Sequence, residues 1–202
     1  MFLGINMSFA ADWQYWSTLS AVHNISEREQ VSMLTELYFA DSLSQNYVYD
    51  EYISYSHKIG SGFNLLGQTY FESVRQPNSK WTGTRSIVAG LSYTKDIHFF
   101  IIKAETRFFY KLTSPSQWDY YRPRIYIIKN IGRVSLSISD EMRVDLTDKR
   151  ISNFYRNRFY ATVSIKVSQV VTLGAGYLSQ SDKIEDGWKS FNGVQTLINI
   201  YF

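Results

Sequence analysis

The chain has no cysteine, only three prolines and only three histidines among its 202 residues. The lack of cysteine excludes disulfides, a thiolate nucleophile and zinc–thiolate sites. No stretch approaches the roughly 18 uncharged apolar residues that a membrane-spanning helix requires, so we expect no such helix. The net charge is +3 and the basic residues are scattered, which argues against a nucleic-acid-binding stripe. The length fits a single domain.

Aromatic residues are abundant, at 17% of the chain, mostly as 16 Tyr and 13 Phe. They favour β-strands, and the scarcity of proline leaves long strands uninterrupted. Residues 99–111 alternate, with Ile102 and Phe108 on one face and Glu105 and Arg107 on the other. The same alternation is found in residues 133–145 and 155–167.

These alternating segments are about 12 residues long, which exceeds the mean strand of soluble proteins and matches a tilted membrane crossing. We therefore expect lipid to contact the apolar face and the charged face to line an enclosed lumen. Asp140 is an exception, because it falls on the apolar face, where a lipid-exposed carboxylate is costly. A soluble barrel is the competing fold, with about eight strands and an apolar interior.

Short polar turns and longer polar loops alternate along the chain, and the short turns recur about every 35 residues, as expected for successive hairpins. The expected short turns are 24–27, 59–62, 95–96, 130–132 and 167–169. The expected loops are 40–46, 76–83, 113–117, 147–153 and 179–190. This asymmetry is typical of bacterial outer-membrane barrels, whose short turns lie in the periplasm.

The pattern predicts an all-β, antiparallel, up-and-down transmembrane barrel in the outer membrane of a Gram-negative cell, with its C-terminus in the periplasm. Counting from Trp13 gives eleven strands, and 10–12 are compatible with the pattern. We expect about 12, because bacterial barrels usually have even numbers and an odd number requires a parallel closing pair.

The two ends of the chain carry further signals. Residues 1–10 resemble the end of a signal peptide and could instead supply an extra N-terminal strand, so we assign the barrel domain to residues 11–202. Phe202 ends an amphipathic strand, which is similar to the signal read by the barrel assembly machinery. The expected partners are therefore that machinery and outer-membrane lipid.

Charged residues two positions apart on successive strands are the strongest candidates for a site, because this spacing puts both on the lumen face. The predicted lumen-lining residues are Glu36, Glu72, Glu105, Arg107, Arg122, Arg124, Glu141, Arg143, Arg156 and Arg158. Two interpretations stay open. Either these residues form a constriction that selects anionic or zwitterionic solutes, or they form a ladder of ion pairs that fills and braces a narrow barrel.

Other chemistry has weaker support. A lipid hydrolase would need a Ser–His pair, but His23, His57 and His98 all lie beside short turns, away from the serines at 135, 137 and 139. We expect no catalytic residues, no cofactor and no metal. An acidic group, Asp182, Glu185 and Asp186, does not match a calcium loop. Aromatic residues are expected near the rim, namely Trp118, Tyr120, Tyr121, Trp188 and Phe191. The 179–190 loop could bind a partner.

Several of these features together resemble a known bacterial family. The chain resembles a family of predicted outer-membrane barrels known only as a domain of unknown function. The features that carry the resemblance are Trp13, the Glu-x-Arg strands at Glu105 and Glu141, the paired arginines and Phe202. The resemblance covers the chain from Trp13 onward and departs at Glu36-Leu37-Tyr38, where an Arg would be expected. It implies the fold and the location and no activity. The leading function is thus a non-enzymatic outer-membrane protein, with a narrow pore for small solutes as its specific form.

Overall fold

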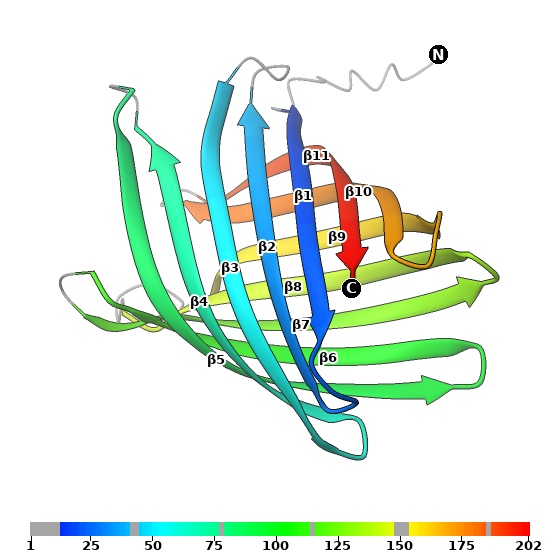
Figure 1. The fold of residues 1–202 in the computed structure, drawn as a ribbon. Coiled ribbons are helices and arrows are strands. Elements are labelled where there is room, and N and C mark those ends of the chain that lie inside the picture. Colours follow the sequence, from blue (N-terminus) through cyan, green and yellow to red (C-terminus); the bar gives the residue numbers. More distant parts are fainter. Residues whose placement is uncertain (1–12, 41–44, 77–78, 114–115, 148–153, 185–186) are drawn as a thin grey trace, which may run out of the picture.

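The computed structural model describes residues 13–40, 45–76, 79–113, 116–147, 154–184 and 187–202, and these form a closed barrel of eleven strands (Figure 1). The strands are β1 (Trp13–Asn24), β2 (Glu29–Ala40), β3 (Gln45–Gly60), β4 (Phe63–Arg75), β5 (Trp81–Ile97), β6 (Phe100–Lys111), β7 (Gln117–Ile131), β8 (Val134–Asp145), β9 (Phe154–Lys166), β10 (Val171–Ile184) and β11 (Gly187–Tyr201). Among these residues no helix is long and apolar enough to cross a membrane.

Each strand pairs antiparallel with its neighbours in the chain, and the barrel is closed by a parallel pair between β1 and β11. The register of this seam runs from Trp13 opposite Asn192 to Val22 opposite Tyr201. The predicted all-β barrel is confirmed, but the preference for 12 strands is wrong. Because β1 lies directly between β2 and β11, the wall has no place for another strand. Residues 1–10 lie outside the described part of the chain.

Four of the five expected short turns lie where the sequence placed them. The fifth is displaced, because β5 continues through Lys95 and Asp96 to Ile97, which pairs with Phe100. The turn itself is made by His98 and Phe99, and His98 adopts a left-handed φ of 52°. Lys95 and Asp96 lie opposite Ile102 and Ile101, so these charged residues belong to the end of a strand.

The expected loop at 179–190 is also wrong, because β10 and β11 stay paired as far as Ile184 and Gly187. Its polarity has another cause. Gln180 and Asp182 point toward the lumen, where they contact Arg158 and Arg156 of the neighbouring strand β9. The polar residues at these positions face a polar interior, and in the sequence such a strand resembles a loop.

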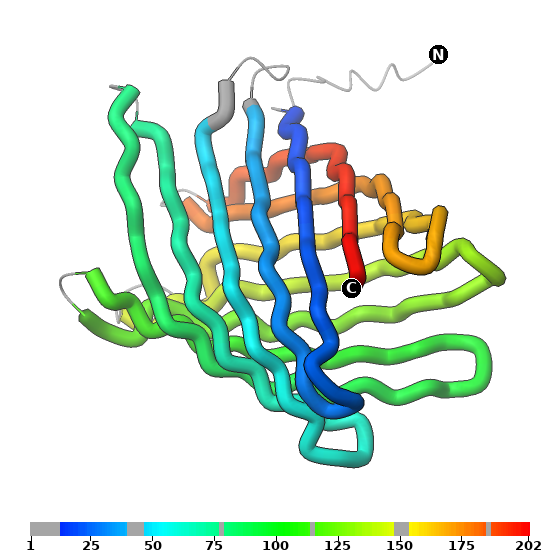
Figure 2. Tube along the Cα trace, viewed as in Figure 1, coloured from blue at the N-terminus to red at the C-terminus, as the bar shows by residue number. Residues whose placement is uncertain are grey.

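The barrel has two walls whose strands run in different directions (Figures 1 and 2). Strands β1–β4 rise steeply in this view, β5 bends from that direction into the other, and β6–β10 run across. The walls contact each other through the lumen, because Arg122 on β7 donates to the Tyr52 hydroxyl on β3 at 3.3 Å. The ring of Trp16 on β1 also lies 6.4 Å from that of Tyr160 on β9.

The faces of the wall are inverted relative to a soluble barrel. Apolar side chains such as Ile138, at 45% exposure, point outward, while Glu141 on the same strand is only 4% exposed inside. Alternation along a pleated strand produces this division directly. The outward Asp140 accepts a hydrogen bond of 2.8 Å from Asn157 Nδ2, so its neighbour on β9 satisfies the exceptional carboxylate.

Gly193 keeps the seam closed, because a Cβ at this position would lie 2.8 Å from the backbone oxygen of Gln14 on β1. We expect Gly193→Ala to reduce the free energy of unfolding by about 1–3 kcal/mol, since the added carbon forces the paired strands apart. Gly67→Ala is the matched control, because a Cβ there meets nothing within 4 Å. Urea unfolding of the refolded proteins measures both. Equal stability of the two variants would contradict a tight seam.

Candidate lumen site

A row of alternating charge crosses the β6–β10 wall on the lumen side. Register pairs Glu105 with Arg124, Arg124 with Glu141, and Glu141 with Arg158. The row ends at Gln180 on β10, whose Oε1 accepts a 2.6 Å hydrogen bond from Arg158 Nε. Side chains directly opposite each other on paired strands lie close enough to interact. The Arg and Glu positions of successive strands therefore meet as neighbours of opposite charge.

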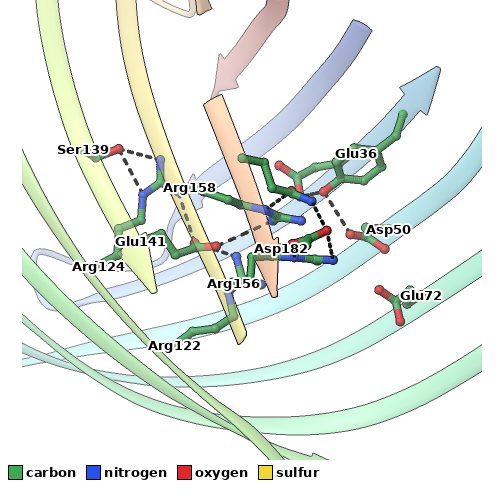
Figure 3. Close-up of polar contacts among 12 residues, drawn as sticks. Glu36, Asp50, Glu72, Arg122, Arg124, Ser139, Glu141, Arg156, Arg158 and Asp182 are labelled. Atoms are coloured by element: carbon green, nitrogen blue, oxygen red, sulfur yellow. Dashed lines mark hydrogen bonds and ion pairs between the residues drawn. The ribbon is translucent and has the colours of Figure 1, made fainter. Parts of the chain in front are cut away.

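Glu141 is the centre of this row (Figure 3). Its Oε2 accepts a 2.7 Å hydrogen bond from Arg122 Nη2 and lies 3.7 Å from Arg124 Nη1. Its Oε1 lies 3.6 Å from Arg158 Nη1. Arg124 also donates to the buried Ser139 hydroxyl, at 2.9 Å from Nη2. One carboxylate thus shares its charge among three arginines, which leaves a net positive cluster on this wall.

Three further ion pairs flank the cluster, two of them made by Glu105 and one by Asp182. Glu105 accepts from Lys103 Nζ at 2.9 Å and also pairs with Arg107. Arg156 donates to both oxygens of Asp182, at 2.5 Å from Nε and 3.1 Å from Nη2. Asp182, which the sequence groups with Glu185 and Asp186 in an acidic segment that matches no calcium loop, is the bidentate partner of an arginine. Glu185 and Asp186 lie outside the described residues.

The opposite wall carries a row of carboxylates. Glu36, Asp50 and Glu72 are in register on β2, β3 and β4, and Figure 3 shows them on the blue-to-cyan side of the barrel. Asp50 accepts hydrogen bonds of 3.1 Å from the hydroxyls of both Tyr38 and Tyr70. Tyr38 also donates to Glu36 at 2.9 Å, and Tyr70 to Glu72 at 3.1 Å. Within the described residues, no group of His, Cys, Asp or Glu could hold a metal ion.

A layer of aromatic side chains fills the middle of the lumen. One buried cluster joins Tyr52, Tyr70, Val88, Phe109 and Tyr120 from both walls. The rings of Phe109 and Tyr120 stack at 4.1 Å, and those of Tyr52 and Tyr70 stack at 4.6 Å. A second cluster consists of Trp16, Tyr38, Tyr160 and Leu178. We call the two clusters together the aromatic layer.

Cavities lie on both sides of the aromatic layer. The turn-side cavity has a volume of about 520 Å³ and is lined by Glu36, Lys103, Glu105, Arg107, Arg122 and Arg124, among others. The loop-side cavity has a volume of about 490 Å³ and is lined by Asp50, Glu72, Arg143, Arg156, Arg158 and Asp182, among others. The loop-side cavity therefore has an acidic side on β3 and β4 and a basic side on β8 and β9, whereas the turn-side cavity has both signs on each wall, with Lys58 on β3 and Glu105 on β6.

The structure places nine of the ten proposed site residues against one of these cavities, and the tenth, Glu141, between their arginines. Sequence reasoning missed Asp50 and the aromatic layer. It also placed Tyr120 at the rim, whereas Tyr120 is buried in the lumen and Phe191 lines the loop-side cavity. The parity of each strand could have found these residues, because Asp50, Tyr52 and Tyr70 share the face of Glu72.

The remaining candidates lie apart from the lumen centre. His23 contacts the Phe202 carbonyl oxygen through Nδ1 at 2.8 Å, and His57 Nδ1 lies 3.8 Å from Glu29 Oε1. His98 belongs to a short turn and is exposed. All three therefore lie at the turn end of the barrel. Phe202 is 67% exposed there.

Comparison with known families identifies the chain's relatives. The model of a family described as "Protein of unknown function (DUF2490)" matches residues 13–191, which is most of the chain. The chain belongs to this family. No curated protein matches the sequence significantly. Membership supports the resemblance seen in the sequence and assigns no activity to the DUF2490 barrel.

Glu141 is the residue whose replacement should reduce the stability of the DUF2490 barrel most. Replacing it with Ala leaves Arg122, Arg124 and Arg158 without their shared carboxylate, so we expect the free energy of unfolding to fall by about 3–5 kcal/mol. Glu27→Ala, in an exposed turn, is the control and should change little. Urea titration followed by tryptophan fluorescence tests this. A Glu141→Ala protein as stable as the control would refute the bracing role.

Proposed function

We propose that this DUF2490 protein is a non-enzymatic outer-membrane barrel of a Gram-negative cell, with a narrow, charged lumen that serves as a pore for small polar solutes. One observation carries the proposal. Two polar cavities, of about 520 and 490 Å³, lie on either side of an aromatic layer that, among the described residues, consists of side chains of the wall strands. We infer that this layer separates the two cavities.

The composition of the aromatic layer makes a pore plausible. Among the described residues all eleven elements are wall strands, so side chains are what separates the cavities. A change of side-chain rotamers is a smaller rearrangement than the removal of a folded plug. Charged residues line both cavities on each wall, which gives polar solutes favourable contacts along the axis.

The outer surface supports a lipid environment. Large apolar side chains point outward on successive strands, with Ile53, Ile87 and Ile138 each close to half exposed. Soluble monomers rarely expose apolar surface of this extent, and a barrel with a polar interior is the arrangement that lipid favours. In outer-membrane barrels the short turns face the periplasm. With that orientation Phe202 also lies in the periplasm, where the barrel assembly machinery would act on the final strand.

The separation of Ser139 from the histidines supports a role other than serine hydrolysis. Ser139, the buried serine of β8, is bound to Arg124, and the three histidines lie at the turn end. A serine hydrolase needs its base within hydrogen-bond distance of the nucleophile.

Opening the aromatic layer should increase ion flow. Phe109 is fully buried in the lumen, and its neighbour Phe108 is 41% exposed on the outer face. We expect the wild type to give small conductance steps in planar bilayers and Phe109→Ala to raise the conductance several-fold, with Phe108→Ala unchanged as the matched control. If wild type and Phe109→Ala both remain silent across voltages and salt concentrations, the pore is disproved.

Insertion into lipid is tested separately. Ile138→Arg places a cation in the middle of the outward face of β8, which should reduce the free energy of folding into lipid vesicles by about 2–4 kcal/mol. Ile131→Arg, at the turn end of β7, should cost at most about 1 kcal/mol, since the penalty decreases toward the membrane surface. Equal costs at both positions would contradict a lipid-facing belt.

A further inference from the structure

Some of the opposite charges that line the loop-side cavity pair with each other and some do not. Its basic side includes Arg143, Arg156 and Arg158, and its acidic side includes Asp50 and Glu72. Arg156 forms an ion pair with Asp182, and Arg158 donates to Gln180 and lies near Glu141. Among the described residues, the three ionic side chains of this cavity without an ion pair are Arg143, Glu72 and Asp50.

Arg143 has no carboxylate partner in the described part of the chain. Its guanidinium lies over two aromatic rings, 3.5 Å from the Tyr120 centroid and 5.2 Å from that of Tyr155. Its Nε is buried and has no hydrogen-bond partner. Aromatic faces stabilise a cation, but they leave the directional N–H donors of the guanidinium available for an anion.

Glu72 is the complementary case. Its carboxylate accepts a hydrogen bond from the Tyr70 hydroxyl at 3.1 Å, and none of the ion pairs between described residues includes it. Asp50 lies beside it in register and likewise receives only tyrosine hydroxyls. A partly enclosed anion without a cation costs free energy, and a bound cationic group would repay that cost.

We propose that the loop-side cavity binds a small zwitterionic solute of the amino-acid class, with its carboxylate on Arg143 and its ammonium group on Glu72 and Asp50. A volume of about 490 Å³ lies within the range of small-molecule sites, which is roughly 300–1,000 Å³. Arginine binds a carboxylate through two parallel N–H donors, which fixes the orientation of the solute. This inference rests on the proposed function because the solute must reach the cavity through the lumen.

A matched set of four probes tests the charge requirement. These are 4-aminobutanoate, butanoate, butylamine and butanamide, which have the same chain length and differ in charge. Isothermal titration calorimetry with the refolded wild type in detergent should show 4-aminobutanoate binding at least about tenfold more tightly than the other three. Higher salt should weaken the binding of 4-aminobutanoate, because salt screens the attraction between its charges and those of the cavity. If butanamide binds as tightly as 4-aminobutanoate, or if no probe binds, the site is refuted.

Variants assign the two ends of the solute. Arg143→Gln should lower the affinity for 4-aminobutanoate to that of butylamine, and Glu72→Gln should lower it to that of butanoate. Arg133→Gln in a short turn and Glu51→Gln on the outer face are matched controls that should bind as the wild type does. Unchanged affinity in both cavity variants would refute the assignment, and the wild-type probe comparison decides the matter even where a variant fails to refold.

The binding experiment and the conductance experiment can give negative results independently of each other. If the wild type and Phe109→Ala are both silent in bilayers but the wild type selects 4-aminobutanoate, the pore is disproved and the site is supported. A wild type that conducts but does not distinguish the four probes would keep the pore and refute the zwitterion site.

Discussion

The confinement of charged side chains inside a narrow barrel is the constraint on which the rest of this structure depends. The pleat turns every second residue of each strand toward the lumen, and an enclosed charge must find a partner there. Glu141 meets this need for Arg122, Arg124 and Arg158 at once. The register of β7, β8 and β9 is therefore specified from inside the barrel as well as from its apolar outer face.

The same constraint explains why aromatic residues occupy the centre. Tyrosine and tryptophan present flat apolar faces that pack densely, and Tyr38, Tyr52 and Tyr70 also supply hydroxyls to the charged groups beside them. Arginine guanidinium groups stack on these rings, as Arg124 does on Tyr160 at 4.1 Å. The side chains that would brace the barrel are thus also those that would contact a solute in the proposed pore, and the two interpretations of the charged rows need not compete.

Periodicity in the sequence was sufficient to predict the barrel, the face of each strand and the charged rows. Alternation repeats over about 12 residues per strand, so the inward position of Glu105, Arg107 and Glu141 followed from parity alone. The repeat counted from Trp13 also gave the eleven strands, and only the preference for an even number was wrong, because β1 and β11 close the barrel as a parallel pair. The pairing of Asp182 with Arg156 was not predictable, since a polar inward face resembles a loop when the register is unknown.

The parallel seam has a consequence for the order of assembly. Every other pair of adjacent strands forms a local hairpin, but the seam joins residues about 180 positions apart, as in the hydrogen bond between Tyr15 and Thr196. Contacts between such distant residues form slowly, because ordering the intervening chain has a high entropic cost. The cylinder is therefore completed last at the edge between the first and final strands, and until then it presents two open edges that a folding catalyst can hold.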